Sequence, residues 1–204
     1  MDDALTLARR AAVGSYTWAR AARPGAAGIA ALHLGDEASA LAMGSAAQPE
    51  RVIALDLGPA TLARRFFASD RPGEAAIETA IAEVEDAIMP LRPALRPDAW
   101  LVSTDAAVAA VAELAGLSWR AGPATLDRDT VEALFNRWAA LALGRPASQD
   151  ALPVGGPVAG RFAATLLVLR EWLHHLPQTV LAVAPVAPSP SAFSYPVSAA
   201  GIEP

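Results

Sequence analysis

Three short apolar runs within residues 28–57 constrain the fold more than any other part of the chain. The runs are Gly28–Leu34, Ala38–Gly44 and Arg51–Leu57, with Gly35-Asp36-Glu37 between the first two and Ser45–Pro49 between the next two. Runs of this length with turn residues between them are typical of antiparallel strands joined by tight turns. We therefore expect a three-stranded antiparallel meander here.

Helices and further strands are expected on both sides of the meander. Apolar residues at helical spacing predict a helix over the first twenty residues, and the short apolar run Trp100–Thr104 indicates a buried strand. Other helices are expected over 59–67, 73–89, 105–115 and 157–176. A further helix is expected to end at 143 and to be capped by Asp127 or Asp129. A last strand is expected at 179–183. The combination indicates an α/β fold with antiparallel and parallel strands flanked by helices.

Charge and residue content exclude several classes of function. The formal net charge is −5 and the arginines are scattered, whereas a nucleic-acid-binding domain shows a basic face, so no nucleic-acid partner is expected. The chain has no cysteine, which removes disulfides, thiol catalysis and thiolate metal sites. The histidines, His33, His174 and His175, include no pair spaced four residues apart as in a helical zinc site.

The two ends of the sequence suggest where the protein resides and how it is divided. Met1-Asp2-Asp3 is acidic where a signal peptide is basic, and no apolar stretch approaches about 20 residues. We therefore expect no membrane partner and a cytoplasmic protein. From Pro185 onward prolines alternate with serine and alanine, so residues 185–204 are expected to form a flexible tail after one domain at 1–184.

Several stretches carry a likeness to a known family. The likeness rests on five stretches in this order: a strand ending in Leu57-Gly58, the helical segment Leu62–Phe67, the link Ser69–Pro72, Thr125–Leu134 and residues 156–176. They resemble the exopolyphosphatase/guanosine pentaphosphate phosphatase (Ppx/GppA) family, over about residues 5–183. The resemblance implies a single half-domain of the actin-like (ribonuclease H-like) fold, corresponding to the second half of the family's chain.

The phosphate-binding loops of that family depend on glycines, which bring backbone N–H groups close to phosphate, and on a Ser or Thr hydroxyl. The resemblance places the first loop at residues 33–40, where Gly35 is kept and Ser39 matches the hydroxyl position. It places the second loop at Ser103-Thr104-Asp105 and the two alanines after it. The residues in place of family glycines include three acids, Asp36, Glu37 and Asp105. Like charges a few ångströms apart cost at least ~1 kcal/mol even in water, so these loops are expected to be degenerate as phosphate sites.

Two further departures bear on activity. The family's first half, with its own phosphate loop and its general-base glutamate, has no counterpart before residue 26, and Pro157-Val158-Ala159 replaces an "RAD" segment. We therefore expect no catalytic residue and a non-catalytic binding or assembly module, either a homo-oligomer or bound to a partner chain. A phosphohydrolase completed by a partner chain is the alternative, and a small-molecule or metal-sensing domain is a third possibility.

Some side chains allow two interpretations. Asp36, Glu37 and Asp105 supply oxygen ligands that could hold Mg²⁺ or Ca²⁺, or they form a solvated acidic rim, which we favour. His33 is either an acid–base group, with Ser39 nearby, or a structural histidine at a strand end. His174-His175 suit the negative end of a helix dipole better than a ligand role. Trp18 lies on a helix rich in alanine and arginine and is expected to face a partner.

Overall fold

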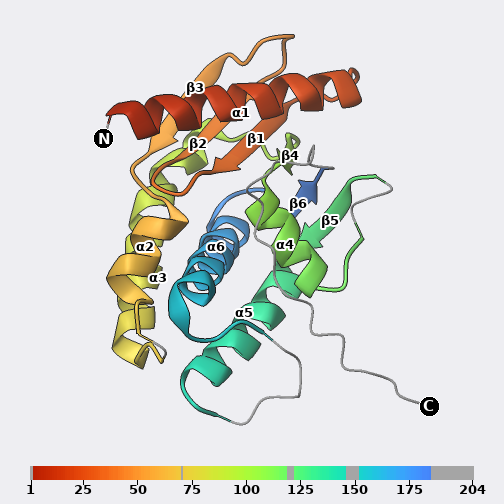
Figure 1. Ribbon diagram of the computed structural model, residues 1–204. Helices are drawn as coiled ribbons and strands as arrows, with labels where there is room; N and C mark the ends of the chain where they lie inside the picture. Colours follow the sequence, from red (N-terminus) through yellow and green to blue (C-terminus); the bar gives the residue numbers. More distant parts are fainter. Residues whose placement is uncertain (1, 70, 119–121, 146–151, 185–204) are drawn as a thin grey trace, which may run out of the picture.

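A six-stranded mixed sheet organises the protein, which is represented by a computed structural model describing residues 2–69, 71–118, 122–145 and 152–184 (Figure 1). The strands are β1 (Ile29–Leu34), β2 (Ser39–Gly44), β3 (Arg51–Leu55), β4 (Trp100–Ser103), β5 (Ala124–Asp127) and β6 (Val180–Val183), and they lie in the order β3-β2-β1-β4-β6-β5. Strands β1 to β3 form the predicted antiparallel meander. Strand β4 pairs with β1 in parallel, β6 with β4 in parallel, and β5 with β6 antiparallel.

Local sequence explains several helix boundaries. The helices are α1 (Asp2–Ala22), α2 (Pro59–Phe66), α3 (Glu74–Ile88), the 3-10 helix η1 (Met89–Ala94), α4 (Ala106–Leu114), α5 (Arg128–Ala142) and α6 (Gly156–His175). Pro59 occupies the first turn of α2, where its missing N–H has no cost. Of the two candidate caps for α5, Asp127 is the one used, since its Oδ1 accepts the Thr130 N–H at 2.7 Å.

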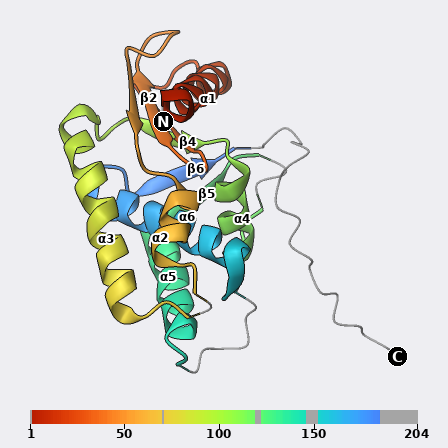
Figure 2. The same ribbon diagram turned by 60° about the vertical axis from the view of Figure 1, so that its left-hand side comes forward.

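The alternation of side chains along the strands divides the core between the two faces of the sheet. On β1, Ala30 and Leu32 point into the larger hydrophobic cluster, whereas Ile29 and Ala31 point into a smaller cluster under α1. Helix α1 lies on this second face, opposite the group formed by α2, α3, α5 and α6 (Figures 1 and 2). Its sheet-facing side is made of alanines, Ser15 and Tyr16, and the small side chains let the helix approach closely.

Helix α6 is the centre of the larger core. It contacts α2, α3, α4 and α5, and most of its side chains between Ala159 and Leu173 are buried. A helix surrounded in this way is apolar around nearly its whole circumference, as the sequence of α6 is. Its amino end reaches the part of the molecule where β1 ends.

Two elements differ from expectation. Ala124–Asp127 forms the edge strand β5, although no strand was predicted there, because four residues are too few to show an alternating pattern. The prolines after α3 end that helix as predicted, but Met89–Ala94 continues as η1. One prediction, the flexible tail at 185–204, lies outside the described residues.

Candidate functional site

The two loops singled out by the sequence lie side by side at one end of the sheet. Because β1 and β4 are parallel neighbours, both strands finish at this edge, which we call the loop end: the β1–β2 turn at residues 35–38 and the β4–α4 junction at residues 103–106. Helix α2 begins next to the turn, since the Ala60 N–H donates to the Asp36 carbonyl at 2.9 Å. The loop end therefore has the arrangement expected of an actin-like half-domain.

The Asp105 carboxylate joins the two loops. Its Oδ1 lies 2.7 Å from His33 Nδ1, and its Oδ2 accepts the backbone N–H of Leu34 at 2.8 Å. The Ser103 hydroxyl donates to the same Oδ2 at 2.9 Å. In a phosphate-binding loop, backbone N–H groups and hydroxyls of this kind donate hydrogen bonds to the bound phosphate. In this protein a side chain of the chain itself receives them.

Burial and charge act in opposite directions on His33. Burial lowers the pKa of its imidazole, while the hydrogen bond and the negative charge of Asp105 raise it, and the pKa ends above its ordinary value of 6.5. Only 20% of the His33 side chain and 12% of the Asp105 side chain are exposed. Sequence reasoning singled out both residues but did not pair them. The available signal was their position at the ends of two strands that proved to be parallel neighbours.

The hydroxyls at the family's phosphate positions are also engaged within the protein. Ser39 Oγ donates to the Leu57 carbonyl at 2.5 Å, which ties β2 to the end of the meander. Thr104 Oγ1 is hydrogen bonded to Ser15 Oγ of α1 at 2.7 Å. These contacts hold neighbouring elements together.

The acids in the β1–β2 turn face arginines from two helices. Glu37 receives two hydrogen bonds of 2.9 Å from the Arg64 guanidinium of α2, which holds the pKa of its carboxyl below the ordinary range. Asp36 Oδ2 lies 3.2 Å from Arg161 Nη1 of α6. The acidic substitutions in this loop are therefore matched by basic side chains that the fold brings to them.

Packing requires glycine at the turn and at the end of the meander. A Cβ on Gly35 would lie 2.6 Å from the Ala38 carbonyl oxygen, and a Cβ on Gly58 would lie 2.3 Å from the Asp36 carbonyl oxygen. Real Cβ atoms do not approach other atoms so closely, so both positions exclude any larger residue. Gly35, the glycine kept from the family loop, is explained by this close packing alone.

The metal triad of Asp36, Glu37 and Asp105, the less favoured interpretation of these acids, is not assembled. Within the described ranges no group of three or more histidine or carboxylate side chains could hold a metal ion. The physical reason is that Asp105 turns toward His33, whereas the turn acids face arginines. Beside them, Leu34, Asp36, Arg161, Thr165 and three apolar neighbours line a cavity of about 20 Å³, enough for roughly one water molecule.

The remaining residues singled out by the sequence lie away from the loop end. Trp18 is half-buried and packs against Trp100 with 6.4 Å between ring centroids, so it is not a fully exposed partner contact. His174 and His175 do lie in the last turn of α6. Their Nε2 atoms also contact carboxylates on α5 and α6, those of Glu132 at 2.8 Å and Glu171 at 3.1 Å.

The fold and the loop end define a half-domain of an α/β, actin-like type, and comparison with known proteins makes the class more specific. No family model matches the sequence, and no curated protein matches it significantly. Solved structures do match: the Aquifex aeolicus PPX-GPPA enzyme has a TM-score of 0.71 at 14% identity over 88% of this chain. An exopolyphosphatase from Cytophaga hutchinsonii has a TM-score of 0.68 at 14% identity over 87% of this chain.

The fold of this chain is therefore that of a Ppx/GppA-like half-domain, as the resemblance in sequence predicted. The chain spans 60% of the length of both of these solved structures. None of the described helices combines the length and the apolar character needed to cross a membrane.

Proposed function

We propose that this chain is a non-catalytic, cytoplasmic binding or assembly module built on the Ppx/GppA-like fold. The observation that carries the proposal is the internal use of Asp105. Its carboxylate accepts the Leu34 N–H and the Ser103 hydroxyl, so these donors are not available to a phosphate. The residues at the phosphate positions then serve to hold β1, β4 and α4 together.

Electrostatics at the loop end supports the same proposal. A phosphate entering there would come close to the carboxylates of Asp36 and Asp105, and each such charge pair at about 4 Å costs about 1 kcal/mol in water and more where the dielectric constant is lower. Arg64 and Arg161 supply positive charge, but Arg64 is bound by Glu37 and Arg161 by Asp36. A polyphosphate would have to displace these partners first.

An apolar surface beside the loop end supports a role in assembly. Val154, just before α6, and Val158, in its first turn, are 37% and 48% exposed. Next to Val158, Pro157 lines a cavity of about 260 Å³ whose other apolar walls include Phe67. Exposed apolar side chains beside a hollow with a polar rim are typical of protein contact surfaces. The charged side chains that line this hollow are Arg64 and Arg161.

Two measurements test the proposal. Purified protein is incubated with polyphosphate and with guanosine pentaphosphate, and binding and phosphate release are followed; we expect neither. Light scattering is then compared for the unaltered protein and Val158→Ser, with Val180→Ser as a matched control because Val180 is 47% exposed on a distant strand. We expect an oligomer that only Val158→Ser weakens. Phosphate release, or a monomer that binds no partner, would overturn the proposal.

The second candidate is a phosphohydrolase that a partner chain completes. It is favoured by the similarity to the solved exopolyphosphatase and by the 60% coverage of that structure, since an actin-like site lies between two halves. The test is phosphate release by this chain mixed with a chain that supplies the other half. Activity that appears only in the mixture would establish this candidate, and its absence would exclude it.

A further inference from the structure

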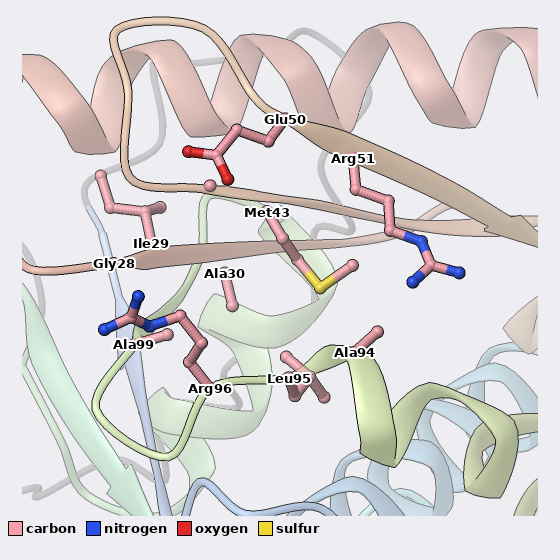
Figure 3. A pocket seen from close by; sticks show the side chains of 11 residues that line it. Gly28, Ile29, Ala30, Met43, Glu50, Arg51, Ala94, Leu95, Arg96 and Ala99 are labelled. Atoms are coloured by element: carbon pink, nitrogen blue, oxygen red, sulfur yellow. The ribbon is translucent and has the colours of Figure 1, made fainter.

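Another cavity lies at the end of the sheet opposite the loop end, and its position does not depend on the function proposed above. It has a volume of about 180 Å³ and is formed where β1 begins, β2 ends and the segment after η1 closes over the sheet (Figure 3). Met43 and Leu95 lie in its middle, with Arg51 to one side and Arg96 to the other. The cavity thus combines an apolar interior with a charged rim.

The interior is apolar and of a size that accepts a small molecule. Ala30, Met43 and Leu95 are at most 7% exposed, and no charged group lies among them. An apolar cavity of about 150 Å³ is known to accept benzene, so 180 Å³ leaves room for about seven non-hydrogen atoms, with a polar group of the ligand at the rim. The unbranched, polarisable side chain of Met43 can adjust to a ligand in a way that a branched residue cannot.

The three charged side chains at the rim differ in whether they are already paired. The Arg96 guanidinium makes two hydrogen bonds with Asp98, at 3.0 and 2.8 Å. The Glu50 carboxylate accepts the backbone N–H and the hydroxyl of Ser45, at 2.9 and 2.7 Å. Arg51 has no hydrogen-bond or ion-pair partner among the residues that the structure describes. As far as the described residues go, the cavity therefore has one uncommitted charge, and it is positive.

The strand register places this charge directly beside the apolar interior. Arg51 on β3 is paired with Met43 on β2, so the two side chains leave the same face of the sheet as cross-strand neighbours. A guanidinium binds a carboxylate through two parallel hydrogen bonds, whereas the nearby Glu50 repels a second negative charge. This combination selects a ligand with a single carboxylate and an apolar remainder.

We propose that this cavity binds a small aliphatic monocarboxylate of about six carbons. Its carboxylate pairs with Arg51, and its chain lies against Met43, Leu95 and Ala30. A ligand of this size makes few contacts, so a dissociation constant in the millimolar range is expected. The proposed binding site lies away from the loop end, and its ligand belongs to a different chemical class from the phosphates that the loop end suggests.

Hexanoate is the probe, and the methionine methyl groups report on its binding. Met43 lies in the cavity and Met89 lies outside it, so titration followed by NMR of the methyl groups should shift the Met43 signal while leaving Met89 unchanged. Hexan-1-ol, which lacks the charge, and hexanedioate, which has two charges, should both bind at least tenfold more weakly. Binding by all three with equal strength, or no Met43 shift at 20-fold excess over the expected millimolar constant, overturns the proposal.

Two arginine variants separate the charge from general effects on folding. Arg51→Gln should weaken hexanoate binding at least tenfold and leave the weak binding of hexan-1-ol unchanged, which also shows that the cavity is intact. Arg10→Gln, an exposed arginine of α1 distant from the cavity, should have no effect. An unchanged affinity for hexanoate in Arg51→Gln would show that Arg51 does not hold the carboxylate and would refute the assignment.

Discussion

Replacing Asp105 is the most direct test of how the loop end is held together. Asp105→Ala removes the acceptor of three hydrogen bonds at once, those from His33, Leu34 and Ser103. Asp105→Asn keeps the size of the side chain and one carbonyl oxygen for the Leu34 N–H but removes the charge. The two variants therefore separate the hydrogen bonds from the electrostatic attraction.

The structure indicates how large each effect should be. Leu34 is 5% exposed, so in Asp105→Ala its N–H is left buried without a partner, which costs about 1–3 kcal/mol. Losing the charge-assisted bond to His33 adds to this, and we expect a total of about 3 kcal/mol. In a domain of this size that corresponds to a fall of roughly 6–12 °C in the unfolding midpoint. Asp105→Asn should cost about 1 kcal/mol.

The pH dependence has a definite sign. Because the pKa of His33 is raised in the folded protein, its contribution to stability is fully present below about pH 6.5 and is lost as the pH rises through the folded value. Stability of the unaltered protein should therefore fall above pH 6.5. In Asp105→Asn the imidazole has lost its anionic partner, so this fall should disappear.

Urea unfolding at pH 6, 7, 8 and 9 measures both quantities for the unaltered protein and the two variants. The free-energy gap between the unaltered protein and Asp105→Asn should be largest at pH 6 and smaller at pH 9. A gap that stays constant over this range would refute the assignment of the His33–Asp105 pair. A cost below about 1 kcal/mol for Asp105→Ala would refute the structural role of the carboxylate.

Three further predictions concern the rest of the fold. Gly58→Ala places a Cβ 2.3 Å from the Asp36 carbonyl and should cost at least about 2 kcal/mol in thermal unfolding, whereas Gly73→Ala, which meets no atom within 4 Å, should have little effect. Trp138→Ala removes a 2%-exposed ring in edge contact with Phe67 at 5.4 Å, and urea unfolding should show a loss of about 3–5 kcal/mol. Asp127→Ala removes the cap of α5 and should cost about 1 kcal/mol in the same assay; no loss would contradict the capping role.

The sequence predicted elements well where the pattern is local. The meander was predicted from turn residues between short apolar runs, and α2 from a proline at its first turn, both confirmed here. Strand β5 was missed because it is short and depends on pairing with β6, whose residues lie more than fifty positions further along the chain. Its formation is decided by a neighbour and not by its own pattern.

At the candidate site, too, the sequence predicted local features but not contacts between distant parts of the chain. The sequence identified the loop positions and the reversal of charge at Asp36, Glu37 and Asp105. It did not identify their partners, and for that reason it offered a metal triad, as the less favoured interpretation, that the described residues do not assemble. Asp105 finds His33 across 72 residues and Glu37 finds Arg64 across 27. Such pairings depend on which elements become neighbours in space.

By itself, then, the sequence determined the α/β class, most of the helices and strands, and the likeness to a Ppx/GppA half-domain. Turn residues, apolar periodicity and prolines act over a few positions, so their consequences can be read locally. Only the tertiary structure decided that Asp105 joins the two loops and that Arg51, which has no partner among the described residues, stands beside Met43. Both depend on strand order and register, which are set by the burial of the whole sheet between its helices.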